Sequence, residues 1–158
     1  MVIVCLATTK DHDAYCALVS EADALHAQKA SRYYRFAGLP SRSKEYFESL
    51  LKDPNKAIFL AEFKGSVAGY AHVEARTEPD VPVLVPMKWT NISDIVVGEK
   101  FQRKGVGKAL MTRAKSWAKE MGSKDVRLSV ADFNETAKAF YKKEGFNVKH
   151  EVLAFSLD

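Results

Sequence analysis

An apolar run leads into a glycine-bearing turn near the middle of the chain, and an amphipathic stretch follows. The run covers residues 92–97, the turn lies within 102–110, and the amphipathic stretch ends at Gly122. A strand that passes through such a turn into a helix presents unpaired backbone N–H groups and the positive end of the helix dipole. Glycine has no Cβ, so the backbone there can approach a ligand closely. The pattern predicts an anion-binding centre where the helix begins.

Two common nucleotide-binding motifs use glycine for the same reason, and neither fits this turn. A P-loop ends in Gly-Lys-Ser/Thr, but Gly107-Lys108 is followed by Ala109, which has no hydroxyl for magnesium. A dinucleotide fingerprint needs a third glycine where Leu110 stands. The remaining pattern is Gln/Arg-x-x-Gly-x-Gly/Ala, beginning at Gln102.

A second pattern follows further along the chain, over residues 134–146. It reads Asn-x-x-Ala-x-x-Phe-Tyr-x-x-x-Gly-Phe. In this order and at this spacing, the two patterns resemble those of the GNAT N-acetyltransferase superfamily. The resemblance is close over 88–147 and extends loosely to the whole chain, where 58–70 is similar to the family's central hairpin. It implies acetyl-CoA (coenzyme A) as cofactor and transfer of its acetyl group to an amine.

The order of predicted elements independently indicates the α/β class. Apolar periodicity and turn residues predict helices over 11–29, 42–52, 104–121 and 134–144, and strands over 2–8, 56–63, 67–76, 89–97 and 125–131, with a terminal strand or hairpin over 146–157. Nothing in the chain reads as a repeat or an interdomain linker, so we expect one domain over 1–158, a mixed sheet with helices on both faces. The resemblance implies a mostly antiparallel sheet, splayed at the strand before the glycine turn.

Composition and charge narrow the classes of partner. The chain is 47% hydrophobic and 28% charged, a globular balance, and no apolar run approaches the ~20 residues of a membrane span. Its first residues lack a basic region, so we expect a cytoplasmic protein without a signal peptide. The net charge is +4, but the basic residues are interleaved with acidic ones along most of the chain. The main local excess of basic residues lies around the glycine turn, where it would attract the phosphates of a cofactor. We therefore expect neither a nucleic acid nor a membrane as partner.

Histidine and cysteine show no metal-binding or nucleophile pattern. The four histidines are scattered without ligand spacing, so we expect no metal. Cys5 and Cys16 read as free thiols. Neither lies in a motif that would make it a nucleophile, which favours direct attack by the amine over a covalent acetyl-enzyme.

The glycine turn and its strand supply the predicted coenzyme-binding residues. Backbone N–H groups and charges at the helix start would hold the pyrophosphate, with the turn contributing Gln102, Arg103, Lys104, Gly105, Val106, Gly107 and Lys108. The resemblance implies that a bulge frees backbone groups of the strand, at Ile95, Val96 and Val97, for pantetheine and the acetyl oxygen. Asn134 is either a helix N-cap or a coenzyme contact, and the two roles are compatible.

Tyr141 matches the family's tyrosine, which implies a general acid for the thiolate leaving group. Proton transfer from a phenol of pKa about 10 to the thiolate of a thiol of about 8.5 is uphill by ~2 kcal/mol. Full transfer need not occur early, because a hydrogen bond to the developing thiolate already helps the transition state. The alternative is that Tyr141 is a core aromatic residue beside Phe140.

Asp94 is the predicted base for the incoming amine. An amine of pKa about 10.4 costs about 4.6 kcal/mol to deprotonate at pH 7, so a base acting through water would help. Many family members have a glutamate at the position of Ser93, and some at that of Asn91. Asp94 could instead orient the acceptor or hold a loop, and a bulge decides whether Ser93 or Asp94 faces the site.

The acceptor is expected to be a small-molecule primary amine. The resemblance places its pocket near the first helices and their connector, and the candidate lining residues are His26, Tyr33, Tyr34, Phe36 and Ser93. For His26 the alternative is a core histidine. Two other functions remain open: acetylation of a peptide N-terminus or lysine, and a non-catalytic acyl-CoA sensor. The family also makes a homodimer an expectation.

Overall fold

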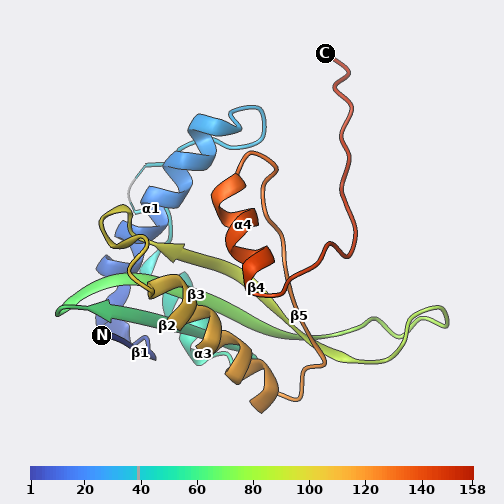
Figure 1. Ribbon diagram of the computed structural model, residues 1–158, viewed down its shortest axis with the longest axis horizontal. Coiled ribbons are helices and arrows are strands. Elements are labelled where there is room, and N and C mark those ends of the chain that lie inside the picture. Colours follow the sequence, from blue (N-terminus) through green and yellow to red (C-terminus); the bar gives the residue numbers. More distant parts are fainter. Residues whose placement is uncertain (39) are drawn as a thin grey trace.

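The computed structural model describes residues 1–38 and 40–158, and Leu39, in the connector after the first helix, lies outside them. The described chain contains both strands and helices in a mixed order (Figure 1). They are β1 (Val2–Leu6), η1 (Thr9–Asp11), α1 (His12–Lys29), α2 (Lys44–Lys52), β2 (Lys56–Phe63), β3 (Ser66–Thr77), β4 (Lys88–Val97), η2 (Glu99–Phe101), α3 (Val106–Glu120), β5 (Asp125–Leu128) and α4 (Glu135–Lys143).

The strands form one mixed sheet in the order β1-β2-β3-β4-β5. The first three neighbouring pairs are antiparallel and β4 pairs with β5 in parallel, which confirms the predicted mostly antiparallel sheet. Lys64 and Gly65 join β2 to β3, and both have positive φ, as a two-residue hairpin turn requires. The parallel β5 follows α3, because a parallel neighbour needs a crossover.

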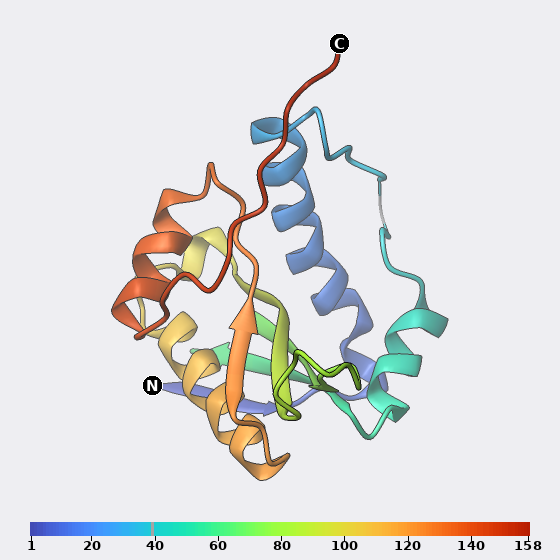
Figure 2. The same ribbon diagram turned by 90° about the vertical axis from the view of Figure 1, so that its right-hand side faces the viewer.

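Helices cover both faces of the sheet, so its central strands are buried on both sides (Figure 2). Along β2, Phe59 and Ala61 pack in the cluster beneath α3, whereas Ile58 and Leu60 pack in the cluster beneath α1 and α2. Successive side chains of a strand point to opposite faces of the sheet, and here both faces are covered by helices and buried from solvent. This explains why β2 is continuously apolar instead of alternating.

Local capping sets several element boundaries. The side chain of Thr8 accepts from the backbone of Lys10 while Asp11 accepts from the backbone of Thr8, and this capping box ends β1 at Leu6, short of the prediction. Ser43 caps α2 by accepting from the backbone N–H of Tyr46 at 3.1 Å. No helix of the described residues is both long and apolar enough to cross a membrane.

The buried face of α1 is shorter than its apolar period predicts. Tyr15, Leu18 and Val19 are buried, but Leu25 is exposed and His26 is only half-buried. The helix extends beyond the sheet in Figure 1, so its last turns have no strand beneath them.

The predicted terminal strand or hairpin over 146–157 is wrong. Residues 146–158 form neither helix nor strand, and the trace leaves the body of the protein after α4 (Figure 1). The sequence pattern favours an extended strand, but no strand of the described chain lies along this segment to share hydrogen bonds. Elsewhere, no predicted boundary differs from the observed one by more than three residues, the largest difference being β5, which ends at Leu128.

Candidate functional site

Strand β4 separates from β5 halfway along its length. The parallel ladder runs from Trp89 opposite Asp125 to Ile92 opposite Leu128, while β4 continues to Val97. On its other edge β4 stays paired with β3 as far as Val97 opposite Gly69. Within the described chain, one row of β4 backbone groups after Ile92 therefore faces no neighbouring strand, and the splay implied by the resemblance is confirmed (Figure 2).

A β-bulge at Ser93 accompanies this separation. His72 opposes Asp94 and Val73 opposes Ile92, so Ser93 is the extra residue. The bulge reverses the alternation of side chains along β4. Ile92 packs in the α3 cluster, whereas Asp94 lies beside His72 on the face toward α1. Asp94 is thus the residue that faces this side, and Ser93 is exposed and accepts from the Asn91 amide at 3.1 Å.

Asp94 is the most perturbed acidic group of the site. Burial raises its pKa to about 6, and the Asp23 charge adds to this effect while Arg42 opposes it. Its side chain keeps 42% of its surface accessible, so the carboxyl is desolvated yet open to a ligand. The neighbouring His72 Nδ1 lies 4.0 Å from its Oδ2.

His72 is a neutral neighbour at pH 7. Burial lowers its pKa to about 4, so its contact with Asp94 is not an ion pair near neutrality. Among the described residues its Nε2 has no hydrogen-bond partner. Asp94 therefore has a polar but uncharged imidazole as its neighbour at pH 7.

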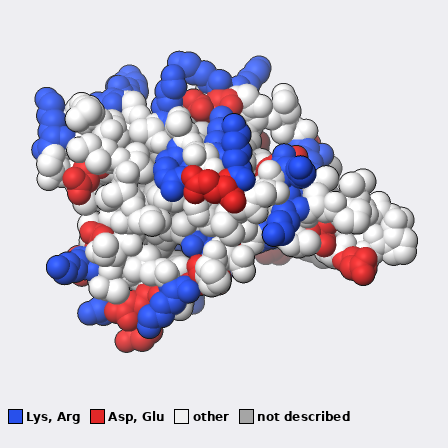
Figure 3. Space-filling model, turned by 90° about the horizontal axis from the view of Figure 1, so that it is seen from below, with Lys and Arg blue, Asp and Glu red and all other residues white. Residues whose placement is uncertain are grey.

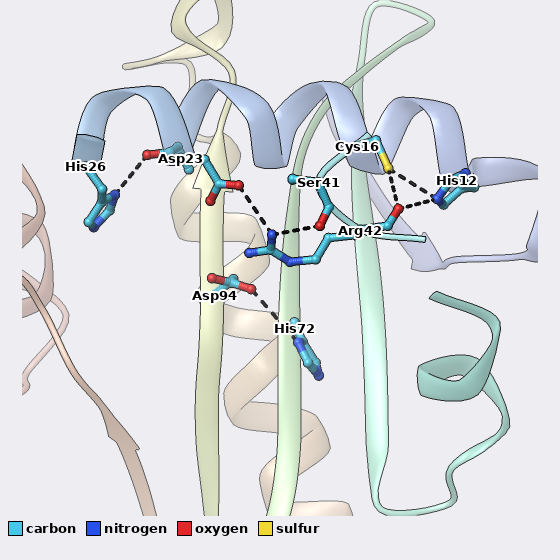
Figure 4. A network of polar contacts seen from close by, with 9 residues as sticks. His12, Cys16, Asp23, His26, Ser41, Arg42, His72 and Asp94 are labelled. Atoms are coloured by element: carbon cyan, nitrogen blue, oxygen red, sulfur yellow. Dashed lines mark hydrogen bonds and ion pairs between the residues drawn. The ribbon is translucent and has the colours of Figure 1, made fainter. Parts of the chain in front are cut away.

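The guanidinium of Arg42 lies between α1 and Asp94 (Figure 4). Its guanidinium Nη1 donates to Asp23 Oδ2 at 3.3 Å, and its carbonyl oxygen is 2.9 Å from His12 Nε2 and 3.4 Å from Cys16 Sγ. The backbone contacts hold the connector against α1 and so fix where the arginine points. Two carboxylates and one guanidinium from three elements thus lie together beneath α1. Neither Asp23 nor Arg42 was among the site residues predicted from the sequence.

Tyr141, the predicted partner of the leaving sulfur, lies on α4. Its ring packs against Phe140 and Phe146, at centroid distances of 5.5 and 5.9 Å. Burial raises its pKa to about 12, and the Asp94 charge contributes to the rise. The two predicted catalytic side chains are therefore within electrostatic reach of each other, although Tyr141 also belongs to an aromatic cluster as the alternative required.

The glycine turn leads directly into α3. Arg103 has φ 58° and Gly105 has φ 82°, and α3 begins at Val106. Positive φ is uncommon for a residue with a Cβ, so Arg103 marks a specialised turn. A Cβ added to Gly107 would come 3.4 Å from Phe140 and 3.6 Å from Val97, so this helix start packs against both α4 and the end of β4.

The charges around this turn suit an anion. Arg103, Lys104 and Lys108 are exposed at a helix N-terminus, where the helix dipole adds to their positive potential. Over the face shown in Figure 3, basic and acidic side chains are interleaved, as the sequence predicts. Asn134 caps α4, its Oδ1 accepting from the Ala137 backbone at 3.1 Å, which confirms the capping role.

The structure brings only some of the predicted acceptor residues together. His26 packs edge-on against Tyr34 and Phe133, at 5.0 and 5.3 Å, and its Nδ1 contacts the Ala22 carbonyl at 2.9 Å. This cluster bridges α1 and the segment before α4, and His26 within it is half-buried. Tyr33 and Phe36 are exposed in the connector and lie outside the cluster.

The sequence matches a known family over most of its length. The pattern of the acetyltransferase (GNAT) family covers residues 24–146. An uncharacterized N-acetyltransferase of Methanocaldococcus jannaschii is 30% identical over 107 residues, which are 68% of this chain and 46% of that protein. Streptothricin acetyltransferase A of Bacillus subtilis is 31% identical over 66% of this chain and 60% of its own length. An N-alpha-acetyltransferase of Sulfurisphaera tokodaii is 34% identical, over 64% and 62%. The chain thus spans about half to three fifths of these relatives.

Solved structures share the fold at lower identity. A mutant of a protein from Bacillus halodurans superimposes with a TM-score of 0.93 at 22% identity, over 98% of this chain and 99% of that one. An aminoglycoside N-acetyltransferase in complex with a bisubstrate analogue, CoA-S-monomethyl-acetylneamine, gives a TM-score of 0.77 at 16% identity, over 100% and 99%. At these identities the likeness establishes the fold.

Proposed function

Because this chain belongs to the GNAT acetyltransferase family, whose members use acetyl-CoA, we propose that it transfers an acetyl group from acetyl-CoA to a primary amine of a small molecule. The observation that carries this proposal is that Asp94, with a pKa of about 6, lies in the splayed part of β4 and that its charge reaches Tyr141. The amine attacks the thioester carbonyl directly in a ternary complex. Its new N–C bond forms as the C–S bond breaks, and no acetyl-enzyme is needed.

The start of α3 would hold the coenzyme pyrophosphate. Among the described residues, no backbone carbonyl outside α3 accepts from the N–H groups of residues 103–108, and the exposed Arg103, Lys104 and Lys108 add charge. Gly107 leaves room where a side chain would stand between α3 and α4. These features fit a polyphosphate ligand without a metal ion bound by the protein.

The splayed part of β4 would bind the acyl arm. Backbone groups at Val96 and Val97 have no partner strand on the β5 side in the described chain, so they can donate to and accept from a ligand. A backbone N–H aimed at the carbonyl oxygen stabilises the negative charge that develops there. The side chains of Ile95 and Val97 pack against the α3 cluster and serve the core.

Asp94 would receive the amine proton, directly or through water. With a pKa of about 6 the carboxyl is roughly nine-tenths ionised at pH 7, so it can attract an ammonium ion and still accept a proton. Its raised pKa makes it a stronger base than an ordinary aspartate. Asp23 lies in the same cluster and adds negative potential for a cationic acceptor.

Tyr141 would act as a hydrogen-bond donor to the leaving sulfur. Its pKa of about 12 lies well above the ~8.5 of a thiol, so a completed proton transfer would be uphill by ~5 kcal/mol. A hydrogen bond that strengthens as charge develops on sulfur has no such cost. Burial of Tyr141 therefore favours stabilisation of the thiolate over full general-acid transfer.

The small-molecule acceptor is supported by two resemblances and one feature of the site. Streptothricin acetyltransferase A is among the relatives, and an aminoglycoside N-acetyltransferase shares the fold. Asp94 and Asp23 together suit an amine-rich cation. The N-alpha-acetyltransferase of Sulfurisphaera tokodaii favours a second candidate, in which the acceptor is a peptide N-terminus.

Release of free CoA thiol against a panel of polyamines, aminoglycosides and peptides tests the proposal. We expect turnover with a small amine, and a loss of kcat/KM of about 10²-fold or more in both Asp94→Asn and Tyr141→Phe. Asp80→Asn, an exposed aspartate, and Tyr46→Phe, an exposed tyrosine of α2, are matched controls that should keep wild-type rates.

The same assay separates the other functions. Turnover confined to peptides would replace the small-molecule acceptor with the second candidate. Tight acetyl-CoA binding by calorimetry without turnover on any acceptor would indicate a sensor, and failure to bind acetyl-CoA would overturn the proposal.

A further inference from the structure

Two carboxylates and one guanidinium lie together where the apolar face of α1 ends. Asp23 lies one helical turn beyond the buried Val19, on the same face of α1, and Asp94 lies on β4. The charge of Asp23 raises the pKa of Asp94, so the two carboxylates interact electrostatically. Figure 4 shows Arg42 between them. The cluster therefore combines two negative charges with one positive charge.

The other titratable side chains around Asp94 do not balance this excess of negative charge. Burial lowers the pKa of His72 to about 4, so its imidazole is uncharged at pH 7. His26, near the end of α1, lowers the pKa of Asp94, but less than Arg42 does. Burial also raises the pKa of three tyrosines whose phenols therefore stay neutral, namely Tyr15, Tyr70 and Tyr141. The cluster thus attracts a cationic ligand at neutral pH.

Asp23 can bind a cation in addition to Arg42. The Nη1 atom of Arg42 donates to Asp23 Oδ2 at 3.3 Å, and among the described residues Asp23 Oδ1 has no hydrogen-bond partner. The side chains of Asp23 and Arg42 keep 26% and 34% of their surface accessible, so solvent screens their ion pair. A carboxylate can accept about four hydrogen bonds. A ligand ammonium can therefore reach Asp23 without first breaking a strong contact.

An anionic group of a ligand fits this place less well. Arg42 has donors to offer, but a carboxylate beside its guanidinium would face Asp23 on one side and Asp94 on the other. Repulsion from two like charges opposes the attraction of one unlike charge. The arrangement therefore favours a ligand with a second positive group.

We propose that Asp23 is a specificity-determining residue, which binds a second ammonium group of the acceptor while the reacting amine lies at Asp94. The inference rests on the proposed function and narrows its acceptor to diamines, small molecules with two amino groups on one skeleton. The amine at Asp94 gives up its proton and takes the acetyl group. The ammonium at Asp23 keeps its proton throughout, and Arg42 competes with it for the carboxylate.

Steady-state release of CoA thiol with matched pairs of amines tests the inference. Each linear diamine of a series of increasing length is compared with the linear monoamine of the same carbon number. At pH 8.5 the amines are mostly protonated, and Asp94, with a pKa of about 6, is ionised. For the diamine of optimal length we expect a kcat/KM about tenfold or more above that of its monoamine, because it gains one charge-assisted hydrogen bond.

Substitutions of Asp23 and Arg42 should change this ratio in opposite directions. Asp23→Asn should bring the ratio of diamine to monoamine kcat/KM down to about one, through a higher KM for the diamine, whereas Asp23→Glu keeps the charge and should retain most of the preference. Arg42→Gln removes the competing cation and should raise the ratio several-fold. A general disturbance of the cluster would instead lower the ratio in all three variants.

The matched control is Asp13→Asn, which removes the same charge from a fully exposed position of α1 and should keep the wild-type ratio. A wild type without diamine preference, a preference that survives Asp23→Asn, or a lower ratio in Arg42→Gln would each overturn the inference. The proposed function would stand in all three cases, because an amine would still be acetylated.

If no amine is acetylated, the proposed function fails, and calorimetric titration of the protein and CoA with the diamines decides the inference by itself. Binding that is weakened about tenfold by Asp23→Asn and kept by Asp13→Asn would support it. Absence of binding, or equal binding by Asp23→Asn, would overturn it.

Discussion

The two sides of strand β4 are built in different ways. On the α3 side, the candidate coenzyme site consists of consecutive backbone groups of one turn, with the positive φ angles of Arg103 and Gly105 and the start of a helix. On the α1 side, the candidate acceptor site consists of side chains from α1, the connector and β4, namely Asp23, Arg42 and Asp94. A change on the first side should alter ligand affinity, whereas a change on the second should alter proton chemistry.

Gly69 lies on β3 against the end of β4, the strand that separates the two candidate sites. A substitution there should have the largest effect on stability and on both sites. A Cβ at Gly69 would come 2.5 Å from the Val96 carbonyl oxygen, so Gly69→Ala must push β3 and β4 apart. We expect a loss of about 1–3 kcal/mol in the free energy of unfolding, measured with urea, together with weaker coenzyme binding and lower turnover.

Gly107→Ala is the control for this comparison. Its Cβ would make ordinary contacts of 3.4 Å or more, so its unfolding free energy should change by less than about 1 kcal/mol. Equal destabilisation by the two substitutions would contradict the close approach of β3 and β4.

Asp94→Asn should raise stability at pH 7 while lowering activity. Folding raises the pKa of Asp94 to about 6, so the folded state binds the proton more tightly and stability falls as pH rises from about 4 to 6. The full shift is worth ~3 kcal/mol, but the carboxyl is partly exposed, and we expect a gain of about 1 kcal/mol in the variant. Thermal or urea unfolding at pH 7 measures it.

The pH dependence provides the second half of this test. His72 has the opposite linkage, because its pKa is lowered to about 4 and its contribution to stability is lost as pH falls from about 6.5 to 4. The two effects oppose each other in the wild type. Unfolding of Asp94→Asn between pH 4 and 6.5 should therefore show a steeper loss of stability on acidification, and identical slopes would contradict the assigned pKa shifts.

The smallest effects are expected from removing one basic side chain on each side of β4, Lys108 on the α3 side and Arg42 on the α1 side. Lys108→Gln should raise the KM for acetyl-CoA by several-fold with kcat unchanged, since it removes a charge that acts only in binding. Arg42→Gln should leave that KM unchanged. It should instead move the acidic limb of the kcat/KM profile upward by about one pH unit, because Arg42 lowers the pKa of Asp94. Steady-state kinetics over pH 5–9 measure both, and interchangeable phenotypes would contradict the division of roles.

Much of the fold could be predicted from local patterns. The turn at Lys64-Gly65, the continuous apolar strand β2 and the cap of α4 at Asn134 each depend on neighbouring residues, and all three were placed correctly. The terminal strand or hairpin predicted over 146–157 was wrong, and the reason is physical. Its alternation favours a strand, but a strand also needs a partner, and a periodic pattern does not say where the partner is.

The candidate site divides in the same way. Tyr141 and the residues of the glycine turn stand in contiguous motifs, so sequence spacing was enough to single them out. Asp23 and Arg42 were missed, because they are ordinary charged residues in a helix and a connector. The connector before α2 is rich in arginine and aromatic residues. That composition favoured Tyr33 and Phe36 as site residues, but both are exposed and lie outside the cluster of His26, Tyr34 and Phe133.

The sequence by itself determined the order of the elements up to α4, the candidate anion site at the start of α3 and the family to which the chain belongs, because these depend on contiguous residues and on backbone geometry. Only the tertiary structure decided that Ser93 forms the bulge, that Asp94 turns toward α1, and that burial raises its pKa to about 6. The physical reason is that desolvation and charge act through space. They depend on which distant segments cover a residue, and that is settled only when the sheet and its helices have packed.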